Sequence, residues 1–579
     1  MQISLIHLPS LAFVSRAMAC CLLLPLFSTV PVLAVAWASD DTAALLVQTD
    51  LGPVRGERLS GYAVFRGIPF AAPPTGELRW RPAQPAVPWG PEPRDARAFG
   101  AVCPQPELPG QGFARTDMAE DCLTLNVVAP LPEKGQLAGS LEGQARPVMV
   151  WVHGGAYIVG SGREALDELP SGLSRRGVVL VSFNYRLGRL GFFTHPSLER
   201  EQPDGVGGNF WLSDQIAALD WVQRNIARFG GDPGNVTIFG VSAGGSSVNS
   251  LAVSPAAQGL VHRAISQSGG GLFNAEKSPE QALARGFDYA RSWGFTGDDV
   301  LAQLRTLSMA DILDHEQGPP QFGAIIGNRL LPESPSVAFA AGRLNVASYM
   351  AGSTSDEASI FGLMGFSAEV LEERFGIRLD DISGAYTADG ALDQAELLRQ
   401  VQADFIFTSG ANGLAALAAK AGRGAYAYRF AYLSTGAPAD AKGVPHGGEV
   451  PYVLGGLENA SSEDRRIAAL MQDYWTAFAA TGNPVGPGNP PWRPVTFPHP
   501  VTLVIADDIR EVEDFRARQL AVWYRKWGRE RGLSALAATV SDRDVAIEPR
   551  GGPTPALPGV GSRRVATSEA GTSGRIKCT

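Results

Sequence analysis

Three short apolar segments in the first half of the chain constrain its fold more than any other feature. They are VMVWVHGG (148–155), GVVLVSFNYR (177–186) and VTIFG (236–240), each rich in β-branched residues and bounded by turn residues. Such runs are typical of strands buried on both faces. Between the last two lies LSDQIAALDWVQRNIARFGGDP, whose apolar residues recur at helical spacing until two glycines and a proline end the pattern. This order predicts a βαβ unit, and therefore an α/β fold with a parallel central sheet.

The third segment runs directly into the pentapeptide GVSAG (240–244), which has the form G-x-S-x-G. A match this short also arises by chance, so its context decides its meaning. Here a predicted strand hands over to a predicted helix, which is the setting of a nucleophile elbow. Small flanking residues suit a strained turn, and the helix N-terminus favours an oxyanion beside the serine. We therefore predict that Ser242 is a nucleophile.

A serine hydroxyl needs a base, and the chain has seven histidines. In a fold of this kind the acid and the histidine follow the serine, which excludes the three histidines that precede it. His262 follows too closely, His315 lies in a charged helical segment, and His499 is near the end of the folded region. His446 lies in the glycine-flanked loop GVPHGGEVPYVLGG, which suits a catalytic base. A solvated loop histidine is the alternative.

The acid should lie between the serine and His446. The segment YMAGSTSDEASIFG offers Asp356 and Glu357, just after a short apolar strand. Spacing alone does not choose between these two carboxylates.

The N-terminus carries the pattern of an export signal. An apolar run follows Arg16 and ends in the small-residue pattern AWA (36–38) before the polar segment SDD. We predict a signal peptide over residues 1–38 and a secreted or periplasmic enzyme of bacterial source. An uncleaved anchor is the alternative; lipidation of Cys20 is disfavoured because no apolar run precedes it. No later segment reaches the roughly 18 apolar residues of a membrane span, so we expect no stable membrane insertion.

Cysteine usage agrees with export. Cys103 and Cys122 bracket a stretch rich in proline and glycine, and an oxidising compartment favours a disulfide there, with two buried thiols as the alternative. There is no C-x-x-C or H-E-x-x-H motif, so we expect no metal, and nothing in the sequence calls for a cofactor. Residues 39–532 are predicted to form one catalytic domain, and residues 533–579, which include Cys578, a disordered tail.

The overall charge limits the class of partner. The 579 residues carry a net charge of −9, which argues against nucleic acid because nucleic-acid binding calls for a basic stripe. The hydrophobic fraction of 45% is enough for a large core. The expected partner is a small-molecule ester; the oligomeric state stays open.

These segments together resemble the type-B carboxylesterase/lipase family, which includes bacterial para-nitrobenzyl esterases, fungal lipases and cholinesterases. The resemblance covers about residues 47–531 and is carried by several blocks that occur in order. They are FRGIPFAAPP, EDCLTLNV, VMVWVHGGAYIVGSG, NYRLGRLGFF, GNFWLSDQIAALDWVQRNIARFGGDPGNVTIFGVSAGGSSV, AISQSGG, SDEASIFG, GVPHGGEVPYVLG and WTAFAATGNP. The resemblance implies an α/β-hydrolase fold: a mostly parallel twisted sheet flanked by helices, with a disulfide-closed flap.

The resemblance also implies roles for individual residues. Ser242 corresponds to the nucleophile, His446 to the base and Glu357, in preference to Asp356, to the acid. The other residues to which the resemblance gives a role are the oxyanion-hole residues Gly155, Ala156 and Ala243, the residues Glu449 and Ser268 beside the histidine, the ion pair of Arg79 with Glu120, and the flap disulfide of Cys103 with Cys122.

Two departures from the cholinesterase pattern bear on the substrate. Val241 stands where a cholinesterase has an acidic residue, and the flap (103–122) contains no tryptophan to stack on a quaternary ammonium. We therefore expect a serine esterase that hydrolyses neutral esters through an acyl-enzyme. Trp211 stands where many members of the family have a small residue. It is either a core aromatic residue or a residue that narrows the substrate gorge.

Two rival functions remain. A lipase would need an apolar flap, whereas this flap carries Glu107, Arg115, Asp117 and Glu120. A non-catalytic adhesion protein of the same family would have no need of an intact Ser242, Glu357 and His446.

Overall fold

The structure is a computed structural model that describes residues 45–533 and Leu536, except for 108–114, 132–140, 142, 167–171, 203–204, 273–275, 316–321, 389 and 458. The predicted signal peptide (1–38) lies outside the described residues. So does most of the predicted tail (533–579), including Cys578.

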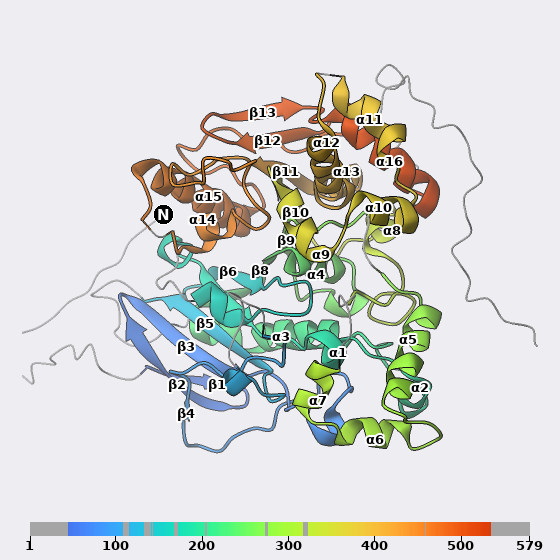
Figure 1. The fold of residues 1–579 in the computed structure, drawn as a ribbon. Coiled ribbons are helices and arrows are strands. Elements are labelled where there is room, and N and C mark those ends of the chain that lie inside the picture. Colours follow the sequence, from blue (N-terminus) through green and yellow to red (C-terminus); the bar gives the residue numbers. More distant parts are fainter. Residues whose placement is uncertain are drawn as a thin grey trace, which may run out of the picture. The chain divides into compact units, whose positions relative to one another are not determined.

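One large sheet organises the described residues. Its strands are β1 (Leu45–Thr49), β2 (Gly52–Leu59), β3 (Tyr62–Pro69), β4 (Arg94–Asp95), β5 (Thr124–Pro130), β6 (Arg146–Val152), β7 (Val179–Phe183), β8 (Gly231–Val241), β9 (Arg263–Gln267), β10 (Ser348–Thr354), β11 (Gly424–Phe430), β12 (Val501–Ile505) and β13 (Ile509–Glu513). Their spatial order is β1-β2-β3-β5-β7-β6-β8-β9-β10-β11-β12-β13, with β4 beside β2 (Figure 1). From β7 to β12 all neighbours are parallel, and the pairs at the two edges are antiparallel except for β4 with β2. The predicted parallel core is confirmed.

Sixteen α-helices surround the described sheet. They are α1 (Gly188–Gly191), α2 (Pro196–Glu201), α3 (Phe210–Asn225), α4 (Ala243–Leu251), α5 (Pro279–Ser292), α6 (Val300–Thr306), α7 (Met309–Asp314), α8 (Pro335–Ala340), α9 (Phe361–Met364), α10 (Ala368–Phe375), α11 (Leu379–Thr387), α12 (Gln394–Ala403), α13 (Ser409–Lys420), α14 (Val450–Leu454), α15 (Ser462–Thr481) and α16 (Ala517–Arg531). Local sequence fixes several boundaries. A capping box of Ser461 and Asp464 starts α15, and Gly482 in the left-handed conformation ends it.

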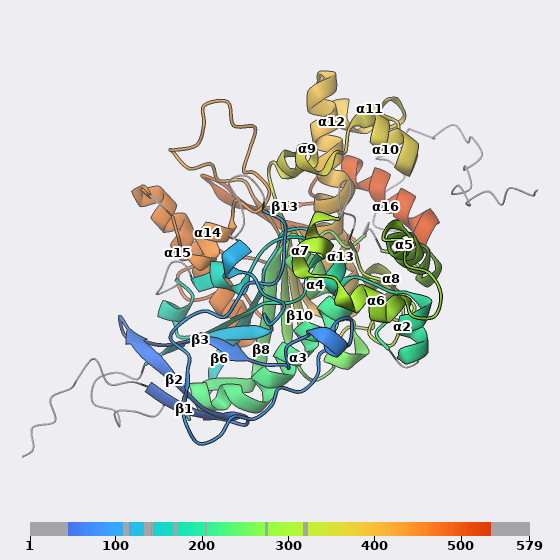
Figure 2. The ribbon, with the colours of Figure 1, turned by 60° about the horizontal axis from the view of Figure 1, so that its bottom comes forward.

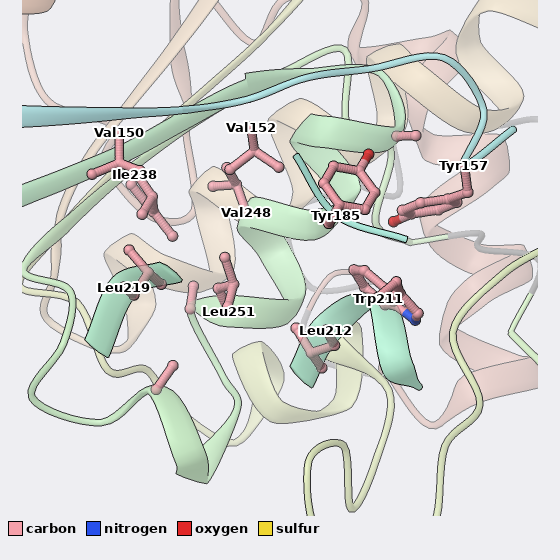
Figure 3. Packing of buried hydrophobic residues seen from close by; sticks show 14 of the residues in the cluster. Val150, Val152, Tyr157, Tyr185, Trp211, Leu212, Leu219, Ile238, Val248 and Leu251 are labelled. Carbon is pink, nitrogen blue, oxygen red and sulfur yellow. The ribbon is translucent and has the colours of Figure 1, made fainter. Parts of the chain in front are cut away.

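Alternation along the buried strands builds a core on each face of the sheet. In β6, Val150 and Val152 face the side covered by α3 and α4, whereas Trp151 faces the side covered by α15. Figure 3 shows Val150 and Val152 on the first side, near Val248 and Leu251 of α4. Both faces are therefore apolar, which explains why the central strands have no polar alternation.

Two groups of helices lie away from this central layer. Helices α2, α5 and α6 gather in one group, and α10, α11, α12 and α16 in another, in both ribbon views (Figure 1, Figure 2). The central layer carries the segments that concern function.

The carboxyl ends of five neighbouring parallel strands meet at one edge of the sheet. The turn 153–157 follows β6, Ser242 follows β8, Ser268 follows β9, residues 355–357 follow β10, and the segment 431–446 follows β11. Ligands of open α/β sheets bind at this edge. Residues 204 positions apart in sequence, such as Ser242 and His446, are thereby brought to neighbouring loops.

A disulfide joins Cys103 and Cys122, whose Cα atoms are 5.0 Å apart, so the predicted pairing is confirmed. Both cysteines are buried. The segment they close includes residues 108–114, which lie outside the described residues.

Arg79 and Glu120 form a largely buried ion pair next to this disulfide. Arg79 Nε donates to Glu120 Oε2 at 2.7 Å, and Nη2 pairs with Oε1. Arg79 Nη1 also donates to the carbonyl of Leu307 at 2.7 Å. The pair therefore ties the flap to the chain after α6.

Candidate active site

Ser242 occupies a strained turn between β8 and α4. Its backbone angles are φ 58° and ψ −121°, a conformation that non-glycine residues rarely adopt. Its N–H donates to the carbonyl of Gln267 at 2.8 Å, which holds the turn against β9. A Cβ at Gly240 would lie 2.4 Å from Val152 O, and one at Gly244 2.1 Å from the same atom. The glycines of the motif are therefore required by the close approach of β6.

His446 and Glu357 form a buried pair. His446 Nδ1 and Glu357 Oε2 are 2.5 Å apart, and the two side chains are 8% and 0% exposed. The other carboxylate oxygen, Oε1, accepts from Ser268 Oγ at 2.6 Å and from the Thr354 N–H at 2.7 Å. Both oxygens of the Glu357 carboxylate are thus held by hydrogen bonds to neighbouring residues.

The neighbouring carboxylate, Asp356, points elsewhere. Its Oδ1 accepts from Arg399 Nη1 at 2.7 Å. The structure therefore places Glu357, and not Asp356, against the histidine.

The loop that carries His446 is fastened to the segment after β10. The His446 N–H donates to Ser359 Oγ at 2.9 Å, the Val444 N–H to Ser355 Oγ at 2.8 Å, and the Asp356 N–H to the Val444 carbonyl at 2.7 Å. Because these bonds tie one loop to the other, the distance between imidazole and carboxylate is fixed by the backbone.

The two groups shift each other's proton affinity. Burial by itself would raise the pKa of Glu357, but the nearby His446 and three hydrogen bonds lower it below its ordinary value. Burial would lower the pKa of His446, but the Glu357 charge and hydrogen bond raise it above its ordinary value. The carboxylate accepts a hydrogen bond from Nδ1–H, which leaves Nε2 as the basic atom of the neutral ring.

His446 Nε2 is buried and has no hydrogen-bond partner among the described residues. The loop that bears His446 comes close to the elbow. A Cβ at Gly447 would lie 3.7 Å from Val241 Cγ2. No hydrogen bond joins Nε2 to Ser242 Oγ in this part of the chain. Such contacts often tighten only when substrate binds.

The turn after β6 lies against the elbow on its other side. A Cβ at Gly154 would lie 3.5 Å from the Ser242 Cβ. Gly155, Ala156 and Tyr157 have φ angles of 96°, 55° and 63°, so the turn contains three successive left-handed residues. The N–H groups of Gly155, Ala156 and Ala243 have no acceptor among the described residues. The turn after β6 and the start of α4 thus carry three N–H groups without an acceptor among the described residues.

His153 supports this turn from inside the protein. Its ring stacks on Tyr185 with centroids 4.3 Å apart, and the Tyr185 hydroxyl donates to the His153 carbonyl at 2.9 Å. Burial lowers the pKa of His153 to about 4, so its ring is neutral at physiological pH. His153 therefore packs the base of the turn without adding charge.

Glu449 is a second buried carboxyl group in this region. Its Oε1 accepts from Gln267 Nε2 at 3.3 Å, and burial together with the Glu357 charge raises its pKa to about 7. Of the two residues expected beside the histidine, Ser268 contacts Glu357 directly, whereas Glu449 influences His446 through charge.

Trp211 belongs to the core. It is fully buried, its ring stacks on Phe192 at 5.3 Å, and its centroid lies 5.0 Å from that of Tyr157 (Figure 3). Its Nε1 donates to Asn209 Oδ1 at 3.2 Å. Of the two interpretations of Trp211, the structure supports the core aromatic; the residue reaches the site only through Tyr157, the residue after Ala156.

One contact of the candidate site has no counterpart in the sequence analysis. The ring of Phe407 lies beside the His446 imidazole, with centroids 4.6 Å apart and planes inclined by 43°. Phe407 lies in an apolar helical segment, and nothing in its sequence context distinguishes it from the neighbouring core residues.

Within the described ranges, no group of three or more histidine, cysteine, aspartate or glutamate residues is placed to hold a metal ion. Among the helices that the structure describes, none has both the length and the apolar character of a membrane span.

The fold and these segments match known proteins. Residues 43–523 match the model of the carboxylesterase family. The chain is 35% identical over 468 residues to the fumonisin B1 esterase of Sphingopyxis macrogoltabida, covering 77% of this chain and 84% of that protein. It is 32% identical to the para-nitrobenzyl esterase of Bacillus subtilis (strain 168), covering 76% and 90%.

Solved structures agree. A PNB esterase superposes with a TM-score of 0.69 at 30% identity and covers 83% of this chain and 100% of its own. A carboxylesterase from Geobacillus stearothermophilus gives 0.71 at 30% identity, with 83% and 99% covered. The predicted α/β-hydrolase fold is confirmed, and the chain belongs to the carboxylesterase family and is a carboxylic ester hydrolase.

Proposed function

We propose that this protein is a serine carboxylesterase that hydrolyses neutral esters through an acyl-enzyme, with Ser242 as nucleophile, His446 as base and Glu357 as acid. The observation that carries the proposal is the buried pair of His446 and Glu357, which leaves Nε2 without a partner among the described residues, on a loop that comes close to the strained turn of Ser242. A non-catalytic member of the family has no use for this arrangement.

In the first step Ser242 Oγ attacks the ester carbonyl carbon while its proton passes to His446 Nε2. Glu357 stabilises the imidazolium that forms, through the Nδ1 hydrogen bond. The imidazolium then returns the proton to the leaving alkoxide, and the C–O bond of the ester breaks to give the acyl-enzyme. A water molecule repeats the sequence, so that the acid leaves and Ser242 is restored.

The negative charge that develops on the carbonyl oxygen needs donors. The N–H groups of Gly155, Ala156 and Ala243 have no acceptor among the described residues, and they belong to the turn after β6 and to the residue after Ser242. We assign them to the oxyanion hole, where removal of one donor typically costs about 2.7–4 kcal/mol of transition-state stabilisation.

The surroundings of Ser242 favour an uncharged substrate. Val241, half-buried next to the nucleophile, places an apolar side chain against the loop of His446. A cationic alcohol group would meet no carboxylate from that position. We therefore predict that 3,3-dimethylbutyl acetate is turned over at least as fast as acetylcholine, its cationic isostere; a strong preference for acetylcholine would contradict a neutral substrate.

We further propose that the mature protein works in the periplasm or outside the cell. The disulfide between Cys103 and Cys122 supports this location, because such bonds persist in oxidising compartments.

Ser242→Ala tests the nucleophile. We expect it to abolish turnover of p-nitrophenyl butyrate and labelling by a fluorophosphonate probe. Ser246→Ala is the matched control, because Ser246 lies one turn along α4 and its hydroxyl donates to the Gly269 carbonyl. It should keep both activities. Full activity in the Ser242→Ala variant would refute the assignment.

A further inference from the structure

A π-helical turn interrupts the long helix between α12 and α13. It spans Asp404–Thr408, and the Ser409 N–H closes it by donating to the Asp404 carbonyl. Thr408 Oγ1 also donates to the Ala403 carbonyl, five residues earlier, at 3.4 Å. π turns are rare and occur mostly as single turns, frequently at functional sites. The turn inserts a residue into the helix and so reorients the side chains that it carries.

The turn is fixed at both ends. Arg516 Nη2 donates to Asp404 Oδ2 at 2.7 Å, and Arg429 Nη1 donates to Thr408 Oγ1 at 3.0 Å. Just beyond it, a Cβ at Gly410 would lie 2.4 Å from the Gly270 backbone. The start of α13 is therefore locked against the loop after β9, and the helix cannot slide to remove the extra residue.

The two aromatic residues of the turn have separate neighbours. Phe405 packs against Phe375 and Trp523, with centroids at 5.2 and 5.5 Å. Phe407 packs against Phe361 at 5.9 Å and against the His446 imidazole at 4.6 Å. Both side chains are buried. Phe405 of the turn thus packs against residues of α10 and α16, whereas Phe407 packs against the candidate base.

His446 has a distinct neighbour on each side. Glu357, from the turn after β10, accepts a hydrogen bond from Nδ1, and Nε2 is buried without a partner among the described residues. Glu449, just before α14, raises the pKa of His446 when its carboxyl group is ionised. The Arg429 guanidinium of β11 interacts with Glu357 through charge. Phe407 packs against the imidazole ring itself, at an inclination of 43°. An aromatic face is electron-rich, and it attracts a cation placed within about 6 Å of its centroid.

We propose that Phe407 is a positioning residue for His446: its ring holds the imidazole in plane with the Glu357 carboxylate and stabilises the imidazolium that forms when Ser242 loses its proton. This inference rests on the proposed role of His446 as base. It explains why a rare helical turn lies directly behind the candidate base. The contact acts on the charged form of the ring, so its effect differs from that of ordinary core packing.

The test compares Phe407→Leu with Phe405→Leu, which removes a ring from the same turn without touching His446. The pH dependence of kcat/KM for p-nitrophenyl butyrate reports the pKa of the base in the free enzyme. In Phe407→Leu the acidic limb should move to lower pH by about one unit, because the imidazolium loses the ring face. At the pH optimum kcat should fall by about tenfold, with KM little changed. Phe405→Leu should keep the wild-type limb even where thermal unfolding shows lost stability, and Phe407→Tyr should restore it.

Replacement of Phe407 by pentafluorophenylalanine covers the case in which Phe407→Leu does not fold. It keeps the shape of the ring and removes its electron-rich face, so the acidic limb should again move to lower pH. A wild-type acidic limb in Phe407→Leu or in the pentafluorophenylalanine variant, or an equal shift in Phe405→Leu, would overturn the inference. His446→Ala distinguishes a failure of the proposed function from a failure of the Phe407 proposal. Retained activity in His446→Ala would refute the proposed function. An inactive His446→Ala, together with a wild-type acidic limb in Phe407→Leu or the pentafluorophenylalanine variant, would refute only the role of Phe407.

Discussion

At the scale of single residues, Glu357 sets the pH range in which His446 can act as a base. The pKa of His446 is raised, chiefly because the carboxylate's attraction outweighs the effect of burial. A protonated His446 cannot accept the Ser242 proton, so activity falls as the pH drops through this raised pKa. Asp356 is next to Glu357 in sequence, but its carboxylate accepts a hydrogen bond from Arg399.

Glu357→Gln should therefore move the acidic limb of kcat/KM to lower pH, since the charge that holds the proton on the imidazole is lost. It should also lower kcat by up to about ten-thousand-fold, because the imidazolium is no longer stabilised. Asp356→Asn is the matched control and should leave the limb in place. A limb that moves in Asp356→Asn and not in Glu357→Gln would reverse the assignment of the acid.

The raised pKa of Glu449 should make the free energy of unfolding depend on pH. Its pKa of about 7 is raised by burial and by the Glu357 charge, so the folded state holds a proton there that the unfolded chain releases near its ordinary pKa of 4.5. The neutral carboxyl group is favourable at low pH, and the benefit is lost as the pH rises from 4.5 through about 7. By pH 8 the ionisation of Glu449 should cost about 3 kcal/mol.

Glu449→Gln removes this ionisation. Relative to wild type, its free energy of unfolding in urea should rise between pH 5 and pH 8. A difference between the two proteins that does not change over this range would contradict the raised pKa.

At the scale of elements, the turn after β6 depends on what packs beneath it. Tyr157 follows Ala156 in the left-handed turn, and Trp211 of α3 packs against the Tyr157 ring. Local signals predicted this strand, this turn and α3, because each is written in consecutive residues. The contact between Tyr157 and Trp211 could not be predicted, because it depends on how α3 docks.

Trp211→Ala should lower the free energy of unfolding by about 3–5 kcal/mol, as for other large core truncations. It should also lower kcat, because Tyr157 loses its support and the Ala156 donor moves. Trp221→Ala is the matched control: Trp221 is equally buried in α3, but its ring packs against Phe229. It should lose similar stability with kcat retained in the folded protein. Equal loss of kcat in both variants would remove the special role of Trp211.

The disulfide of the flap is a second element with a measurable effect. It joins residues 19 positions apart, and opening a loop of that size should cost about 3 kcal/mol in the chain-entropy model. The double variant Cys103→Ser, Cys122→Ser should show this loss in urea unfolding. A reducing agent should lower the stability of the wild type by a similar amount and leave the double variant unchanged. A wild type that is insensitive to reduction would contradict the pairing.

At the scale of the whole molecule, the sheet order explains why a site assembled from five distant segments could be partly predicted. The parallel strands β6, β8, β9, β10 and β11 are neighbours, so the segments at their carboxyl ends meet at one edge. The strand–turn–helix pattern around Ser242 and the glycine-rich loop of His446 are local signals that identify two of these segments. Spacing could not choose between Asp356 and Glu357, because side-chain direction after β10 is set by Arg399 and His446. The contact of Phe407 with His446 could not be predicted either, because a π turn changes the helical register on which sequence patterns depend.

In the proposed mechanism, ester hydrolysis proceeds through an acyl group carried by Ser242, and trapping that intermediate tests the mechanism most directly. The protein is mixed with p-nitrophenyl acetate, quenched in acid within the first turnover, digested and analysed by mass spectrometry. We predict one acetyl group on Ser242 in the wild type, much slower acetylation in His446→Ala, and none in Ser242→Ala. An acetyl group on another residue, or turnover of the ester by Ser242→Ala, would contradict the account.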